Sequence, residues 1–123
     1  MILRSLADAR RGPLYQLWVR IPVERHGQIN VRIYPTAASE TDVHGVVGVT
    51  ATRPDGREVA WSVALDMGPA SAKVSGTVEV EQADGSFDTV FEESSPVPSA
   101  GETAALIDHL AQRVAATGTV WLE

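Results

Sequence analysis

Histidine is the main route to acid–base chemistry or metal binding in this chain, because its 123 residues include three histidines and no cysteine. The absence of cysteine excludes disulfides and thiolate metal sites. Only His44 has a carboxylate at a useful spacing, in Asp42-x-His44, since alternate residues of a strand share a face. Asp42 also ends a polar loop, which favours solvation over a catalytic pair. We expect His26, beside a turn glycine, and His109, on the polar side of a helix, to be solvated as well.

Other motifs that carry chemistry are missing from the sequence. No serine stands in a Gly-x-Ser-x-Gly context. Gly45 and Gly48 lie within an alternating apolar run, whereas a phosphate loop would lead into a helix. The pairs Asp55-Gly56 and Asp84-Gly85 are turn residues, because a calcium loop needs several more acids in register. We therefore predict no catalytic residue, no metal site and no cofactor.

Charge and composition restrict the partners and the location. The net charge is −6, and we expect no nucleic-acid binding, because proteins that bind phosphates are normally basic. Residues 1–34 hold six bases and two acids, a net of +4, while residues 35–123 hold four bases and fourteen acids, a net of −10. The chain lacks an apolar run of about 20 residues and a signal-peptide core, so we expect a cytoplasmic protein without a membrane partner. Nine of the ten basic residues are arginine, which is typical of a GC-rich bacterial gene.

Apolar residues alternate with other residues over most of the chain, a pattern typical of half-buried strands. In the first run, for example, Leu17, Val19 and Ile21 would share one face of a strand. The pattern predicts six antiparallel strands, near residues 14–23, 28–34, 43–53, 57–66, 73–83 and 86–92.

Turn residues fix the registers of three hairpins. The sequences Glu24–Gly27 and Arg53–Gly56 suit a type I turn followed by a left-handed glycine, and Asp84-Gly85 suits a two-residue type I′ turn. In each register apolar residues face apolar residues, as a correct pairing requires. The predicted pairs include Val23–Ile29, Ile21–Val31 and Val19–Ile33 in the first hairpin, Val49–Trp61 and Val47–Val63 in the second, and Gln82–Phe87 and Val78–Phe91 in the third.

Near the C-terminus the apolar spacing becomes helical, over about residues 100–117. Ser99 and Glu102 resemble a capping box at its start, and Gly118 is a natural stop. A short final strand is predicted at Thr119–Leu122. The sequence therefore predicts a single α+β domain over residues 1–123, a six-stranded antiparallel meander with one C-terminal helix packed on its apolar face.

One helix is too narrow for this sheet. A helix is about 10 Å wide, and six strands are spaced about 4.8 Å apart. The sheet could curve strongly into a partial barrel around its own core. Alternatively, a second copy of the chain could cover the remaining apolar face in a homodimer. The sequence leaves both alternatives open.

The first hairpin would create a candidate binding patch on the face away from the helix. Its register places Arg20 across from Arg32 and Trp18 across from Tyr34, and His44 begins the next strand. Two arginines beside two aromatic residues could bind a carboxylate, a phosphate or a partner protein. Acids of the last two strands could instead neutralise the arginines, within a closing barrel or between subunits; they are Glu79, Glu81, Asp88 and Glu92.

We therefore expect a small, non-catalytic bacterial binding protein that acts through its sheet surface on another protein or on a second copy of itself. A meander followed by a long helix also occurs in toxin-immunity proteins and secretion-chaperone-like domains, an analogy of architecture alone. The alternative is a small-ligand binding or enzymatic domain with a pocket inside the curled sheet, lined by Trp61, Phe87 and Phe91. A cavity above about 300 Å³ with convergent polar groups would favour that alternative.

Overall fold

The computed structural model describes residues 11–35, 43–67, 72–97, 102–117 and 120–122, except for the side chains of residues 30–35, 43–44 and 67. The strands of this part of the chain are β1 (His26–Pro35), β2 (Val43–Thr52), β3 (Glu58–Met67), β4 (Ala72–Glu81) and β5 (Phe87–Pro96). The helices are α2 (Pro13–Arg20), α3 (Thr103–Ala116) and two short 3-10 helices, η1 (Val23–Arg25) and η3 (Val120–Leu122).

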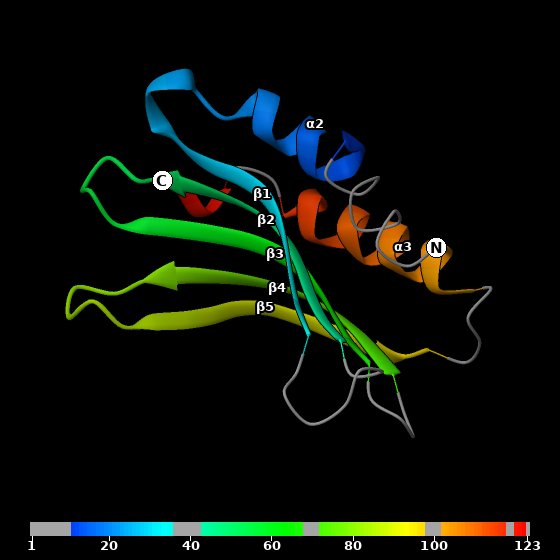
Figure 1. The fold of residues 1–123 in the computed structure, drawn as a ribbon. Helices are drawn as coiled ribbons and strands as arrows, with labels where there is room; N and C mark the ends of the chain where they lie inside the picture. Colours follow the sequence, from blue (N-terminus) through cyan, green and yellow to red (C-terminus); the bar gives the residue numbers. More distant parts are fainter. Residues whose placement is uncertain (1–10, 36–42, 68–71, 98–101, 118–119, 123) are drawn as a thin grey trace.

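The strands form one antiparallel sheet in the order β1-β2-β3-β4-β5. β1 and β5 are its two edges, and the sheet is not closed into a barrel (Figure 1). Both α-helices lie on the same side of the sheet in Figure 1. The predicted α+β class and antiparallel sheet are confirmed, with five strands in the described residues where the sequence predicts six.

The predicted first strand, residues 14–23, is wrong, because this segment forms α2 and the start of η1. Its apolar residues fit both periods. Leu14, Leu17 and Ile21 recur at the spacing of one helical face, and all three are buried. Pro13 stands at the start of the helix, where its missing N–H costs nothing and its fixed φ suits a helix.

The turn between β2 and β3 has the predicted geometry. Gly56 has a φ of 87°, and its N–H donates to the carbonyl oxygen of Arg53 at 3.0 Å. The N–H of Arg53 donates in turn to the carbonyl oxygen of Arg57 at 2.7 Å. The predicted pair of Val49 with Trp61 is confirmed.

The turn between β4 and β5 repeats this geometry, so the predicted two-residue turn is wrong. The N–H of Gln82 donates to the carbonyl oxygen of Ser86 at 2.7 Å, and Phe87 pairs with Glu81 instead of Gln82. The carboxylate of Asp84 accepts hydrogen bonds from the N–H and the hydroxyl of Ser86, which stabilises the longer turn.

A bulge in β5 then restores the predicted register. The pairing skips one residue, Val90, so that Val78 faces Phe91 as the sequence predicts. Residues of β5 before the bulge consequently change face. Phe87, predicted to face the core, is 44% exposed.

The C-terminal helix is shorter than predicted. α3 begins at Thr103 with Glu102 at the N-cap position, and it ends at Ala116. Ser99, predicted to cap it, lies outside the described residues. The predicted final strand is wrong, because Val120–Leu122 form a 3-10 helix that buries Leu122 against the core.

The core lies between the sheet and the two α-helices. α3 contacts β3, β4 and β5, while α2 contacts α3, β1 and β2. α2 thus covers the part of the apolar face that α3 does not reach. The apolar face is therefore covered within one chain. The fully buried side chains include Leu14, Leu17, Val47, Val49, Val59, Trp61, Val63, Leu65, Val74, Ile107 and Leu110.

Two contacts set the approach of α3 to the sheet. A Cβ atom on Gly76 would lie 2.7 Å from Cγ2 of Val114 and 3.4 Å from the carbonyl oxygen of Leu110. The absence of a side chain at Gly76 therefore allows α3 to pack close to β4. Trp61 is fully buried, and its Nε1 donates to Oγ1 of Thr117 at 3.1 Å. A Trp side chain can be buried at low cost when its N–H has such a partner.

Candidate functional site

The residues predicted to form one patch lie on two different parts of the fold. Trp18 and Arg20 belong to α2, whereas Arg32, Tyr34 and His44 belong to β1 and β2. The predicted pairs Arg20–Arg32 and Trp18–Tyr34 are wrong, because α2 is not a strand. β1 pairs with β2 instead, which sets Tyr34 beside His44 in the ladder. The side chains of these three strand residues lie outside the described part of the chain. So does the whole of residues 36–42, which includes Asp42, the predicted partner of His44.

Trp18 and Arg20 bind α2 to its surroundings. Nη2 of Arg20 donates to the carbonyl oxygen of Ala115 at 3.3 Å. The ring of Trp18 stacks on His26, with centroids 3.8 Å apart and 27° between the planes. Nε2 of His26 lies 3.0 Å from the carbonyl oxygen of Trp18 and 2.9 Å from that of Ile21. Because carbonyl oxygens only accept, Nε2 carries a proton and donates to both.

His26 is therefore a half-buried cap on the C-terminus of α2, and the prediction of a solvated side chain is wrong. A histidine that follows a helix is a recognised partner for its last carbonyl groups. The sequence prediction misses this role, because it assigns residues 14–23 to a strand.

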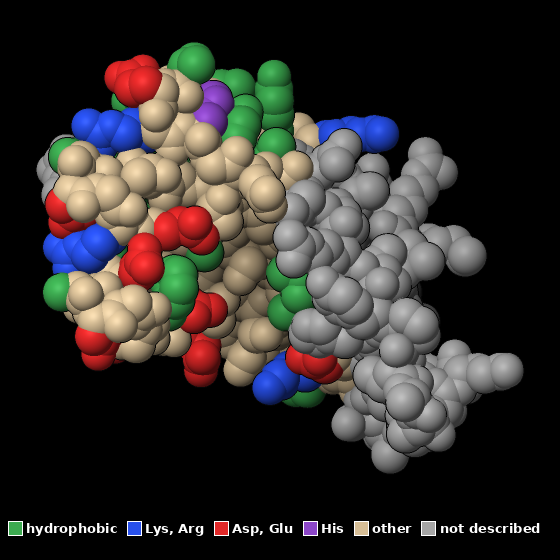
Figure 2. Space-filling model, turned by 60° about the vertical axis from the view of Figure 1, so that its left-hand side comes forward, with side chains coloured by type: hydrophobic (Ala, Val, Ile, Leu, Met, Phe, Trp, Pro, Cys, Tyr) green, Lys and Arg blue, Asp and Glu red, His purple; other side chains and the backbone are tan. Residues whose placement is uncertain are grey.

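We call the side of the sheet opposite α2 and α3 the open face. Its residues alternate along β2, β3 and β4 with the buried core residues, and those with described side chains are half-buried or exposed. Most have small side chains: Val46, Gly48, Thr50, Ala60, Ser62, Ala64, Ser75 and Thr77. In Figure 2 a hollowed tan surface of backbone and small polar side chains lies beside a group of acidic side chains.

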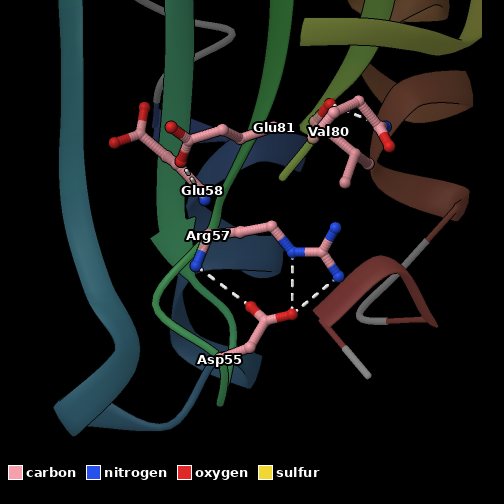
Figure 3. A network of polar contacts seen from close by, with 6 residues as sticks. Asp55, Arg57, Glu58, Val80 and Glu81 are labelled. Atoms are coloured by element: carbon pink, nitrogen blue, oxygen red, sulfur yellow. Dashed lines mark hydrogen bonds and ion pairs between the residues drawn. The ribbon is translucent and has the colours of Figure 1, made fainter. Parts of the chain in front are cut away.

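Acidic residues outnumber basic ones on the open face of β2 to β5. The acids are Glu58, Asp66, Glu79, Glu81 and Glu92, and Lys73 is the basic residue at these positions. Glu58 and Glu81 lie side by side at the ends of neighbouring strands, where Oε1 of Glu81 accepts from the N–H of Glu58 at 3.0 Å (Figure 3). Neighbouring like charges are unfavourable in a sheet by some tenths of a kcal/mol. The open face of β2 to β5 therefore carries a net negative charge, with Lys73 paired with Asp66 and Arg57 near Glu81.

A hollow of about 590 Å³ opens on this face. Its walls come mainly from small residues of β2 and β3, together with the start of β1. The hydroxyls in the walls are already bonded within the chain: Thr50 accepts from the N–H of Gln28 at 2.8 Å, and Ser62 bonds Thr77 at 2.9 Å. The residues that line the hollow are Gly27, Gln28, Val46, Gly48, Val49, Thr50, Glu58, Ala60, Trp61 and Ser62.

The acids of the two turns serve the fold instead. Asp55 accepts from Nε of Arg57 at 2.8 Å and from its N–H at 3.0 Å (Figure 3). The side-chain bond to Arg57 lowers the pKa of Asp55, and Asp55 raises the pKa of Arg57. The hydroxyl of Ser86 likewise lowers the pKa of Asp84. The charge of these two carboxylates is thus engaged locally.

Comparison of the chain with protein-family models, with curated proteins and with solved structures finds no match. Within the described ranges, no group of three or more histidine, aspartate or glutamate residues could hold a metal ion. The helices of that same part of the chain are too short or too polar to cross a membrane.

Proposed function

We propose that this protein is a non-catalytic binding protein that recognises a basic surface of another protein through its open face. The observation that carries the proposal is the charge of that face, where five acids stand against one base across β2 to β5. Complementary charge steers association and excludes partners of like charge.

The shape of the open face supports the same proposal. Its small side chains leave a hollow of about 590 Å³, which an aliphatic or basic side chain of a partner could enter. The large apolar residues of the core lie on the face covered by the helices. Residues of the open face can therefore be substituted without loss of core packing. A surface of this kind suits recognition better than catalysis, because the hydroxyls of Thr50 and Ser62 are bonded within the chain.

A matched pair of arginine variants tests the proposal. Ala60 lies in the hollow and pairs with Glu79 across the sheet, whereas Ala104 is exposed on α3. The partner is isolated from host cells on the immobilised protein, identified by mass spectrometry, purified and titrated against each variant. Ala60→Arg should weaken binding about tenfold or more, because it fills the hollow and adds positive charge. Ala104→Arg should bind as the unchanged protein does.

Circular dichroism of both variants provides the control for folding. The affinity of the unchanged protein should also fall with added salt, since exposed charges are screened beyond about 8 Å at physiological ionic strength. Equal affinity of Ala60→Arg and the unchanged protein would refute the proposal.

The size of the hollow favours one second candidate, a small-ligand binding domain, because ligand pockets measure about 300–1,000 Å³. The three aromatic residues predicted for such a pocket do not converge on the hollow. The indole of Trp61 is fully buried on the helix side, where Phe91 pairs with Val78, and Phe87 lies at the opposite end of β5. A ligand in the hollow should displace the amide resonances of Gly48 and Ser62 in the absence of any partner protein. Ala60→Arg should abolish that displacement.

A further inference from the structure

Among the described residues, no strand pairs with the outer side of β5. The N–H of Val97 donates to the carbonyl oxygen of Ala72 at 2.9 Å, which marks a hydrogen-bonded pair. Bonded and non-bonded pairs alternate along an antiparallel ladder. Glu92 and Ser94 therefore belong to non-bonded pairs and direct their N–H and carbonyl groups away from β4. Pro96 also belongs to a non-bonded pair, with Lys73. Such a position suits a proline, because it has no N–H to donate to β4.

A second hollow, of about 520 Å³, lies between the end of β5 and α3. It is lined by Ser95, Pro96, Glu102, Ala105, Leu106 and His109. Leu106 is a half-buried apolar residue at the border of the core. Side chains of a strand added outside β5 would alternate between this hollow and the opposite side, where Glu92 lies.

Polar contacts hold α3 in place beside β5. The carboxylate of Glu93 accepts from Nε of Arg113 at 3.1 Å and lies 3.7 Å from Nε2 of His109. These contacts join β5 to α3, whose residue His109 lines the hollow. The arrangement combines main-chain groups for affinity with an apolar recess for selectivity, as strand addition to a sheet edge requires.

We propose that β5 binds an extended segment of a partner protein as a sixth antiparallel or parallel strand, with apolar residues toward Leu106 and basic residues toward Glu92. The bulge at Val90 confines regular pairing to Phe91–Pro96. Charge disfavours a second copy as the occupant, because two β5 edges would bring Glu92 and Glu93 of both copies close together. This surface is distinct from the hollow of the open face.

The probe is a blocked peptide in which valine and lysine alternate, compared with one in which valine and glutamate alternate. The valine–lysine peptide should shift the amide resonances of Glu92, Ser94 and Leu106 and slow hydrogen exchange at Glu92 and Ser94. The valine–glutamate peptide should bind about tenfold more weakly or worse, since like charges repel. Absence of binding by the valine–lysine peptide, or equal binding of both peptides, would overturn the proposal.

Two variants of one residue separate main-chain from side-chain recognition. Ser94→Pro removes the outward N–H and should abolish binding, whereas Ser94→Ala keeps that N–H and should bind as before. If Ser94→Pro fails to fold, the valine–lysine peptide with N-methylated amides provides the same test on the unchanged protein. Equal binding of the methylated and unmethylated peptides would overturn the proposal.

The open-face variant separates this proposal from the proposed function. Ala60→Arg should leave peptide binding at β5 unchanged, even where it abolishes binding of the partner to the open face. Peptide-induced shifts at Gly48 and Ser62 instead of β5 would assign the peptide to the open face and reject the edge. Protection of the Glu92 and Ser94 amides that rises with protein concentration alone would assign the edge to a second copy.

Discussion

The two faces of β3 differ residue by residue. Trp61 is fully buried beneath the helices, while its neighbours Ala60 and Ser62 lie half-exposed on the open face. The same contrast holds on β4, where Gly76 admits α3 on one side and Thr77 bonds Ser62 on the other. Large side chains and close contacts thus gather on the covered face, and small or acidic side chains gather on the open face.

This difference teaches that one alternating pattern can serve two requirements. Burial of apolar area on the covered face contributes stability at about 25 cal/mol per Å². The residues of the open face contribute little to packing. Charged residues can therefore occupy that face without disturbing the core. Substitutions on the covered face should therefore change the free energy of unfolding, and those on the open face should change binding.

The largest effect is expected from Trp61→Ala. Removing this buried ring leaves a cavity and deprives Thr117 of a hydrogen-bond partner, so the free energy of unfolding should fall by about 3–5 kcal/mol. Urea unfolding followed by circular dichroism measures the loss. A loss below about 1 kcal/mol would mean that the indole contributes no more than a surface residue.

Gly76→Ala should have the next largest effect. Its new Cβ would meet Val114 at 2.7 Å, and overpacking of this kind costs about 1–3 kcal/mol. The open-face counterpart Gly48→Ala meets the carbonyl oxygen of Trp61 at 3.1 Å and should cost less than about 1 kcal/mol. Val114→Ala should partly rescue Gly76→Ala in a double-mutant cycle. Additive losses would contradict the close contact between α3 and β4.

Ser62→Ala should have a small effect on the open face. It removes the hydroxyl bond to Thr77, and a hydrogen bond in a half-exposed position contributes about 0.5–1.5 kcal/mol. Thermal unfolding of Ser62→Ala beside Trp61→Ala measures the contrast between the two faces on one strand. Equal losses would remove the distinction.

The turn acid Asp55 should show the smallest effect, which is present near neutral pH and is lost in acid. The pKa of Asp55 is lowered in the folded state by its side-chain bond to Arg57, so its contribution is present above its ordinary pKa of 3.8 and is lost as the pH falls through the lower folded value. Asp55→Asn should therefore be less stable than the unchanged protein near neutral pH, and the difference should shrink in strong acid. Unfolding curves at several pH values between neutrality and strong acid test this. A difference that stays constant with pH would exclude the ionised contact.

Local sequence was sufficient for the Arg53–Gly56 turn and for the register of β2 with β3. The Arg53–Gly56 turn needs a left-handed residue at its end, and glycine meets that need at Gly56. The turn then fixes the pairing of every residue of β2 with β3. Glu79, Glu81 and Glu92 accordingly lie on one face, as alternation indicates.

The remaining differences depend on distant contacts. Residues 14–23 fit a strand through Leu17, Val19 and Ile21, or a helix through Leu14, Leu17 and Ile21. Packing against α3 decides for the helix. The bulge at Val90 depends on the pairing of two strands, so β5 alone does not reveal it. The candidate patch built on the first hairpin was lost with that hairpin. Of the four acids predicted to share a face, Glu79, Glu81 and Glu92 do so, whereas Asp88 precedes the bulge, pairs with Val80 and lies on the other face.

Site-directed photo-cross-linking tests the central claim most directly, that the open face is the surface that binds a partner. A photoreactive amino acid replaces Ser62 on the open face or Ala104 on α3, and each protein is irradiated with the purified partner. If the open face binds the partner, position 62 should cross-link to a segment rich in lysine or arginine, and position 104 should give no cross-link. A cross-link from position 104 without one from position 62 would contradict the claim.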